Sequence, residues 1–154
     1  MPTTNTETEQ VDVRGPRFAA WATTAVIVVT LLVSAVSPVS AAVILGVQAA
    51  VFAVGAWLGP RRHPYGLLFR RFVAPRLGPV TDTEPAPPLR FAQLVGFVFA
   101  VAGVVGFAAG HLLVGLVATG LALVAAFLNA AFGVCLGCQV YPLVARVRNA
   151  TSPA

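Results

Sequence analysis

Charged side chains are missing from two long stretches of the chain. Residues 18–60 and 91–145 contain no Asp, Glu, Lys or Arg, and lysine is absent from all 154 residues. Hydrophobic residues make up 58% of the chain and charged residues only 10%, which excludes an ordinary water-soluble domain. A bilayer core of roughly 30 Å needs about 20 apolar residues per helix, so each stretch has room for two spans. The sequence therefore predicts an integral membrane protein.

The predicted fold is all-α, with four transmembrane helices arranged as two hairpins. Ser37-Pro38 interrupts the first apolar stretch, because proline cannot continue the hydrogen-bond ladder of a helix. Gly110-His111 likewise interrupts the second apolar stretch and separates its two spans. The expected helices cover residues 18–36, 39–58, 91–109 and 112–134.

These helices divide the chain into five parts. We expect a disordered tail over 1–13, a first hairpin over 14–59, an Arg/Pro-rich loop over 60–89, a second hairpin over 90–145 that ends in two cysteines, and a tail over 146–154. The first tail is polar and has nothing to bury. The loop contains seven of the twelve prolines, and residues 81–88 are interpreted as a stiff linker.

Arginine placement predicts how the chain is threaded. All ten arginines flank the expected helices on one side of the membrane, and short loops that carry Arg or Lys stay in the cytoplasm. We therefore expect a multi-pass protein of the cell membrane, with both termini and the central loop cytoplasmic. The net charge of +5 is explained by lipid, with no nucleic-acid partner. A cleaved signal peptide is the alternative for the first helix, but its apolar run is long and a second span follows.

The basic loop has a pattern typical of an interfacial helix. Tyr65, Leu68, Phe69 and Phe72 recur near helical spacing, which suits a short amphipathic helix on the cytoplasmic leaflet. An ordinary solvated loop is the alternative. The arginines expected to face lipid headgroups are Arg61, Arg62, Arg70, Arg71 and Arg76.

Two further patterns concern helix packing. Residues 17–19 and 90–92 both read Arg-Phe-Ala where the chain enters the membrane, which suggests a duplicated hairpin with parallel copies. Snorkelling of an arginine at a helix end explains the same match without duplication. Gly106 and Gly110 form a pair of small residues suited to close helix contact. Among the amides, Gln48, Gln93 and Asn129 should face protein because lipid offers them no hydrogen bonds.

The chemical feature of the chain is its cysteine pair, Cys135 and Cys138. Their CxxC spacing permits a disulfide, half of a zinc site, or an attacking and a resolving thiol. We expect the pair at the C-terminus of the fourth helix, where carbonyl groups disfavour thiolate unless Gly133 or Gly137 breaks the helix. Arg90, Arg146 and Arg148 could compensate. Arg90, Asn129 and Gly137 are therefore the predicted supporting residues.

Several activities lack the residues that they require. No carboxylate lies in an expected span, so a proton relay has nothing to titrate. The sequence shows no phosphate-binding loop, metalloprotease motif or nucleophile with a base, which argues against a stand-alone enzyme. No cofactor is expected. A zinc site remains an alternative through Cys135 and Cys138, with His63 nearby or with a second copy supplying the other thiolates.

Several motifs carry a resemblance to a known family. These are residues 62–64 (RHP) with 67–69 (LLF), 75–79 (PRLGP), 88–93 (PLRFAQ), and 127–133 (FLNAAFG) running into 135–138 (CLGC). Over residues 11–148 the chain resembles the largely actinobacterial membrane family called domain of unknown function 4395, from whose pattern Leu89 departs. The resemblance implies no established activity, but it implies partners that are thioredoxin-like or sulfur-transferring proteins.

The sequence hypothesis is a cytoplasmic-face thiol pair that accepts or relays electrons or sulfur and is reduced or loaded by a soluble thioredoxin-like or sulfurtransferase partner. One alternative is a small transport or assembly subunit that forms a homo-oligomer and uses the cysteines structurally. The other is a membrane anchor that recruits a soluble enzyme through its arginine-rich loop.

Overall fold

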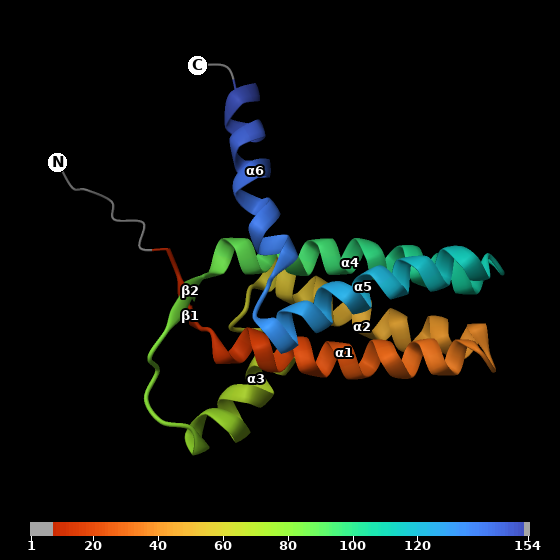
Figure 1. The fold of residues 1–154 in the computed structure, drawn as a ribbon, viewed down its shortest axis with the longest axis horizontal. Helices are drawn as coiled ribbons and strands as arrows, with labels where there is room; N and C mark the ends of the chain where they lie inside the picture. Colours follow the sequence, from red (N-terminus) through yellow and green to blue (C-terminus); the bar gives the residue numbers. More distant parts are fainter. Residues whose placement is uncertain (1–7, 153–154) are drawn as a thin grey trace.

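The computed structural model describes residues 8–152 and consists mainly of four long helices. These are α1 (Arg14–Ser34), α2 (Pro38–Leu58), α4 (Ala86–Ala108) and α5 (Leu112–Phe132), which run side by side along one axis (Figure 1). Each helix is long and apolar enough to cross a membrane. The predicted all-α membrane fold with four spans is confirmed. α4 begins earlier than expected because prolines are tolerated in the first turn of a helix.

The four helices form a ring. α1 packs against α2 and α5, and α4 packs against the same two helices, with the most extensive contact between α2 and α4. No comparable contact joins α1 to α4, or α2 to α5, in the described part of the chain. The buried core lies between α2 and α4 and is built mainly from alanine, with Leu45, Phe52 and Phe107 as its large side chains.

Short turns join the helices at one end of the ring, at the predicted breaks. Ser37 caps α2, since its side chain accepts a hydrogen bond from the Ser40 N–H at 3.2 Å. Gly110 adopts a φ of 79°, which favours glycine, in the turn between α4 and α5. Of the predicted pair of small residues, Gly106 lies in close contact with α5, where an added Cβ would lie 2.8 Å from the Gly115 Cα, whereas a Cβ added to Gly110 would contact nothing within 4 Å.

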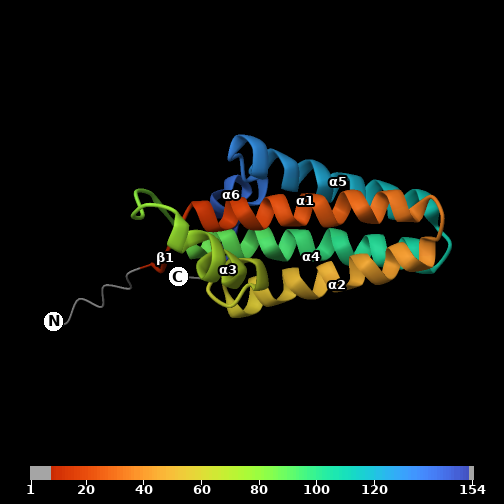
Figure 2. The same cartoon turned by 90° about the horizontal axis from the view of Figure 1, so that it is seen from below.

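The other end of the ring collects the remaining elements (Figure 2). β1 (Gln10–Asp12) pairs antiparallel with β2 (Thr83–Pro85). α3 (Pro64–Leu68) continues through a π-helical turn (Phe69–Val73) and a 3-10 turn (Ala74–Arg76). A sixth helix, α6 (Leu136–Thr151), leaves the ring at a steep angle to its axis (Figure 1).

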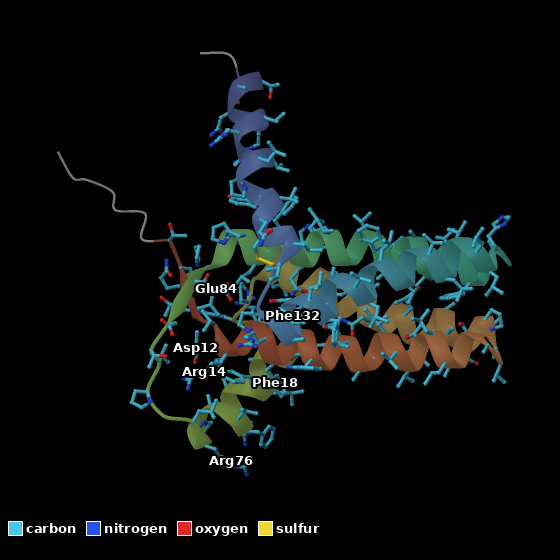
Figure 3. The ribbon with its side chains drawn as sticks, in the orientation of Figure 1. Asp12, Arg14, Phe18, Arg76, Glu84 and Phe132 are labelled. Atoms are coloured by element: carbon cyan, nitrogen blue, oxygen red, sulfur yellow. A yellow bond between two sulfur atoms is a disulfide. The ribbon has the colours of Figure 1, made fainter. Side chains whose placement is uncertain are left out.

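These elements correct two predictions. Disorder over 1–13 is wrong for residues 10–12, because backbone hydrogen bonds join them to 83–85 within the supposed linker; residues 1–7 lie outside the described part. The tail predicted over 146–154 continues α6 and is helical up to Thr151. Figure 3 shows Asp12, Arg14, Arg76 and Glu84 at this end of the molecule, where Arg14 and Asp12 form an ion pair at 2.8 Å.

The two Arg-Phe-Ala motifs make equivalent contacts. Arg17 on α1 donates a hydrogen bond to the Ala130 carbonyl near the C-terminus of α5, at 3.3 Å. Arg90 on α4 donates to the Ala56 and Trp57 carbonyls near the C-terminus of α2, at 3.1 and 2.7 Å. In each case the first helix of one hairpin supplies a cation to the C-terminal, negative end of the second helix of the other hairpin. Duplication of the hairpin stays a prediction.

Candidate functional site

The cysteine pair lies just after α5 ends. Gly133 adopts a left-handed φ of 69°, and its N–H donates to the Asn129 carbonyl at 3.1 Å. The next N–H, from Val134, donates to the Leu128 carbonyl at 3.2 Å. Such a pair of bonds terminates a helix and turns the chain away from it. Glycine is favoured at this position because it has no Cβ to clash.

Cys135 therefore begins a new helix. It is the N-cap of α6, and its Sγ accepts a hydrogen bond from the Cys138 N–H at 3.2 Å. The prediction that the pair lies at the C-terminus of the fourth helix is wrong, because Gly133 ends that helix two residues earlier. The helix therefore has the opposite effect from the one predicted, since its positive N-terminal end favours thiolate over thiol at Cys135.

The two sulfur atoms form a disulfide, drawn as a yellow bond at the base of α6 in Figure 3. The Cα atoms of Cys135 and Cys138 are 5.2 Å apart, within the usual range for bonded cysteines. Both residues are only partly buried. A soluble molecule can therefore reach this region while the helix holds the two sulfurs together.

Contacts with α4 hold the first turns of α6 in place. A Cβ added to Gly137 would lie 2.7 Å from the Ala92 Cα, so the two backbones touch at this point. One turn further along α6, the Tyr141 ring packs on the Phe91 ring with centroids 5.9 Å apart. Gly137 thus acts as a packing residue that sets the position of Cys138 beside α4.

A cavity of about 370 Å³ extends from Cys135 into the membrane-spanning part of the ring. We call it the cysteine cavity. Residues of α1, α2, α4, α5 and α6 line it, and Asn129 and Gly137 are among them. The structure therefore places two of the three predicted supporting residues beside Cys135. Arg90 is directed to the carbonyls of α2, and its hydrogen bonds do not involve either cysteine.

A second cavity of about 270 Å³, the histidine cavity, lies next to the first and shares Gln93, Leu89, Ala19 and Pro16 with it. His63 lines it and is only 4% exposed. Among the residues that the structure describes, its Nε2 atom has no hydrogen-bond partner, nor does the buried Oε1 of Gln93. Burial lowers the pKa of His63 to about 4, while the nearby Gln93 amide acts in the opposite direction.

Sequence reasoning named His63 only for a zinc site and missed its burial. One sequence signal was present: Pro64 favours the first position of a helix, which makes His63 the N-cap and fixes its place. The amide predictions fared better. Gln48 is 1% exposed and accepts a hydrogen bond from the Tyr65 hydroxyl at 2.7 Å, so it faces protein as expected.

The arginines of the basic loop have individual partners. Arg61 forms an ion pair with Glu9 at 2.7 Å, Arg70 donates to the Arg61 carbonyl, and Arg71 lies over the Phe72 ring at 5.9 Å. Leu67, Leu68 and Phe72 are exposed on the same helical segment. An interfacial position for residues 64–76 remains a prediction. Within residues 8–152 no three His, Cys, Asp or Glu side chains cluster as metal ligands would.

A family model described as a domain of unknown function, DUF4395, matches residues 11–146. No curated protein and no solved structure matches the chain.

Proposed function

We propose, from the premise that the chain belongs to the DUF4395 family and from the geometry of its cysteine pair, that it is a membrane thiol–disulfide exchange protein. Its partner is a soluble dithiol protein of thioredoxin-like chemistry. The observation that carries the proposal is the position of Cys135 as N-cap of α6, with the Cys138 N–H directed at its sulfur.

This position makes Cys135 the exchanging residue. The backbone N–H and the helix dipole stabilise a thiolate at Cys135, and a stabilised thiolate is both the attacking and the leaving group of thiol–disulfide exchange. Cys138 sits one turn inside the helix and is the resolving residue. Stabilising the reduced pair also makes its disulfide a stronger oxidant.

Exchange proceeds in two balanced steps. A thiolate of the reduced partner attacks Sγ of Cys135, which forms an intermolecular disulfide and releases Cys138 as thiolate. The second thiolate of the partner then attacks its own bonded sulfur and releases Cys135. The partner leaves as a disulfide, and two electrons have moved to the membrane protein as a dithiol.

The exchange takes place at the cytoplasmic face of the cell membrane. The ten arginines of the chain flank the spans at the end of the ring that also holds Cys135, and the turns at residues 35–37 and 109–111 carry no charge. Arginine-bearing ends of membrane proteins remain in the cytoplasm. Arg146 and Arg148 on α6 lie on the approach to the disulfide and suit a partner with an acidic surface.

Trapping tests this proposal. Cys138→Ser removes the resolving thiol, so Cys135 should accumulate mixed disulfides with thioredoxin-like proteins in acid-quenched cells. Cys135→Ser is the matched control and should trap about tenfold less, because Cys138 lacks the N-cap position. Equal trapping by the two variants, or trapping by neither, would contradict the proposal. Non-reducing gels and mass spectrometry of the adducts provide the measurement.

A further inference from the structure

We propose that the cysteine cavity binds a membrane quinone, which accepts the two electrons that the cysteine pair receives. The inference rests on the proposed exchange function and identifies where its electrons go. It is carried by three observations: the chemistry of the cavity lining, the place where the cavity opens, and a buried acceptor without a partner.

The lining excludes a charged redox carrier. Every residue around the cavity is uncharged, and the polar side chains besides Cys135 are Thr23, Gln93 and Asn129. A nicotinamide dinucleotide or a sulfur oxyanion would find no cation to offset its charge, and burying a charge without a partner is costly. The volume of about 370 Å³ falls within the roughly 300–1,000 Å³ of small-molecule sites. The chemistry fits a neutral, flat and apolar carrier.

The cavity opens on the outer surface of the four-helix ring, which would contact lipid. Leu121 and Val124 of α5 line it and are 52% and 54% exposed on the outer surface of the ring. α4 and α5 touch closely at Gly106 and Gly115, near their connecting turn. Toward Cys135 the small residues Ala92, Gly96, Ala122 and Ala126 line the space instead. A molecule dissolved in the bilayer can therefore enter between these helices without crossing the headgroups.

A buried polar atom points to hydrogen bonding inside the cavity. Within residues 8–152 the Oε1 atom of Gln93 accepts no hydrogen bond, although the amide lies beside His63, and burying an unsatisfied acceptor costs about 1–3 kcal/mol. A quinol hydroxyl donates to such an acceptor, and the amide N–H groups of Gln93 or Asn129 donate to a quinone carbonyl. The amides can therefore form hydrogen bonds with both the quinone and the quinol, and Cys135 lines the same cavity.

The reaction balances with the quinone as oxidant. The Cys135 thiolate adds to a ring carbon, which forms a C–S bond and moves an electron pair to a ring oxygen that takes up a proton. The Cys138 thiolate then attacks Sγ of Cys135, so the S–S bond forms while the C–S bond breaks and its electron pair stays on the ring. This electron pair moves through the quinone ring to the second oxygen, which takes up the second proton and gives the quinol. Quinones act as the terminal oxidant of dithiols in the bacterial periplasm, so this class of oxidant has sufficient driving force.

The test uses the purified full chain in detergent with decylubiquinone as the probe. Reduced protein should become oxidised on adding the probe, seen as loss of maleimide-reactive thiols and as an equal amount of quinol. Ala126→Phe places an aromatic side chain in the cysteine cavity and should slow this oxidation by about tenfold or more. Val117→Phe, on an exposed part of α5 outside the lining, is the matched control and should react like the unchanged protein.

Each outcome decides the proposal. Protein that traps a thioredoxin-like partner through Cys135 but keeps its thiols in the presence of decylubiquinone would overturn the quinone site and leave the exchange function standing. Protein that neither traps a partner nor reacts with the probe would overturn both. If Ala126→Phe does not fold, Gln93→Leu replaces it and should raise the quinone concentration needed for half-maximal rate. An unchanged rate in both folded variants would refute the cavity as the site.

Discussion

His63 makes the stability of the fold depend on pH at the scale of a single residue. Its imidazole is buried beside Gln93 and has a pKa near 4, against about 6.5 for the same group in an unfolded chain. The unfolded state therefore binds a proton between these values and the folded state does not. Stability is fully present above pH 6.5 and is lost as the pH falls toward 4.

The expected loss is about 3 kcal/mol across this interval, since one pKa unit corresponds to about 1.4 kcal/mol. Thermal unfolding of the purified protein, followed at several pH values, measures it. His63→Gln removes the titrating group and should flatten the profile between pH 4 and 6.5. A profile equally steep in this variant would show that other groups carry the dependence. His111→Gln, at an exposed position in the outer turn, is the control and should leave the slope unchanged.

Glycine contacts fix the approach of α4 to α5 at the scale of elements. Gly106 of α4 lies against the backbone of Gly115, so a methyl group at residue 106 would clash with main-chain atoms that cannot rotate away. Gly120 of α5 faces open space. Two glycines of neighbouring helices thus have opposite roles, one required by packing and the other not.

Gly106→Ala should accordingly destabilise the protein by about 2 kcal/mol, because overpacking forces the helices apart. Gly120→Ala should leave stability unchanged or raise it slightly, since alanine favours helix over glycine by about 1 kcal/mol in water. Denaturant unfolding in the same detergent compares the two variants. A similar loss in both would mean that the close approach is not specific to Gly106.

The sequence predicted the elements that depend on hydropathy and missed those that depend on local geometry. Four spans follow from long apolar stretches, and proline and glycine mark their turns. The paired strands are only three residues each and carry no alternating pattern long enough to detect. α6 was missed because Pro142 lies inside it and its polar residues lower its mean hydropathy. The helical spacing of Leu136, Val140, Leu143 and Val147 was the signal that could have found it.

The error over α6 changed the interpretation of the site. CxxC spacing was visible in the sequence, but Gly133 and Val134, the two residues between Phe132 and Cys135, decide whether the cysteines meet the negative or the positive end of a helix. The cavity beside Cys135 could not be predicted either, since its lining comes from five helices. Asn129 was singled out only as an amide in an apolar span.

At the scale of the whole molecule, the structure separates a charged end from an uncharged one. The strands, α3 and α6 all lie at the end where Arg17 and Arg90 anchor the carbonyl termini of α5 and α2. Both cations are held by the C-terminal ends of helices long and apolar enough to span a membrane. Inverting the protein would carry these and the other arginines across the bilayer, which the cytoplasmic retention of basic loops opposes.

Labelling of single cysteines tests this threading. In a background where Cys135 and Cys138 are both replaced by serine, His111→Cys places a thiol in the exposed outer turn and Ser152→Cys places one after α6. A membrane-impermeant maleimide applied to intact cells should label residue 111 and label residue 152 about tenfold less until the membrane is opened. The reverse pattern would put Cys135 outside the cytoplasm and move the soluble partner to the opposite side. Labelling of both sites in intact cells would show mixed orientation, so the arginines would not determine the threading.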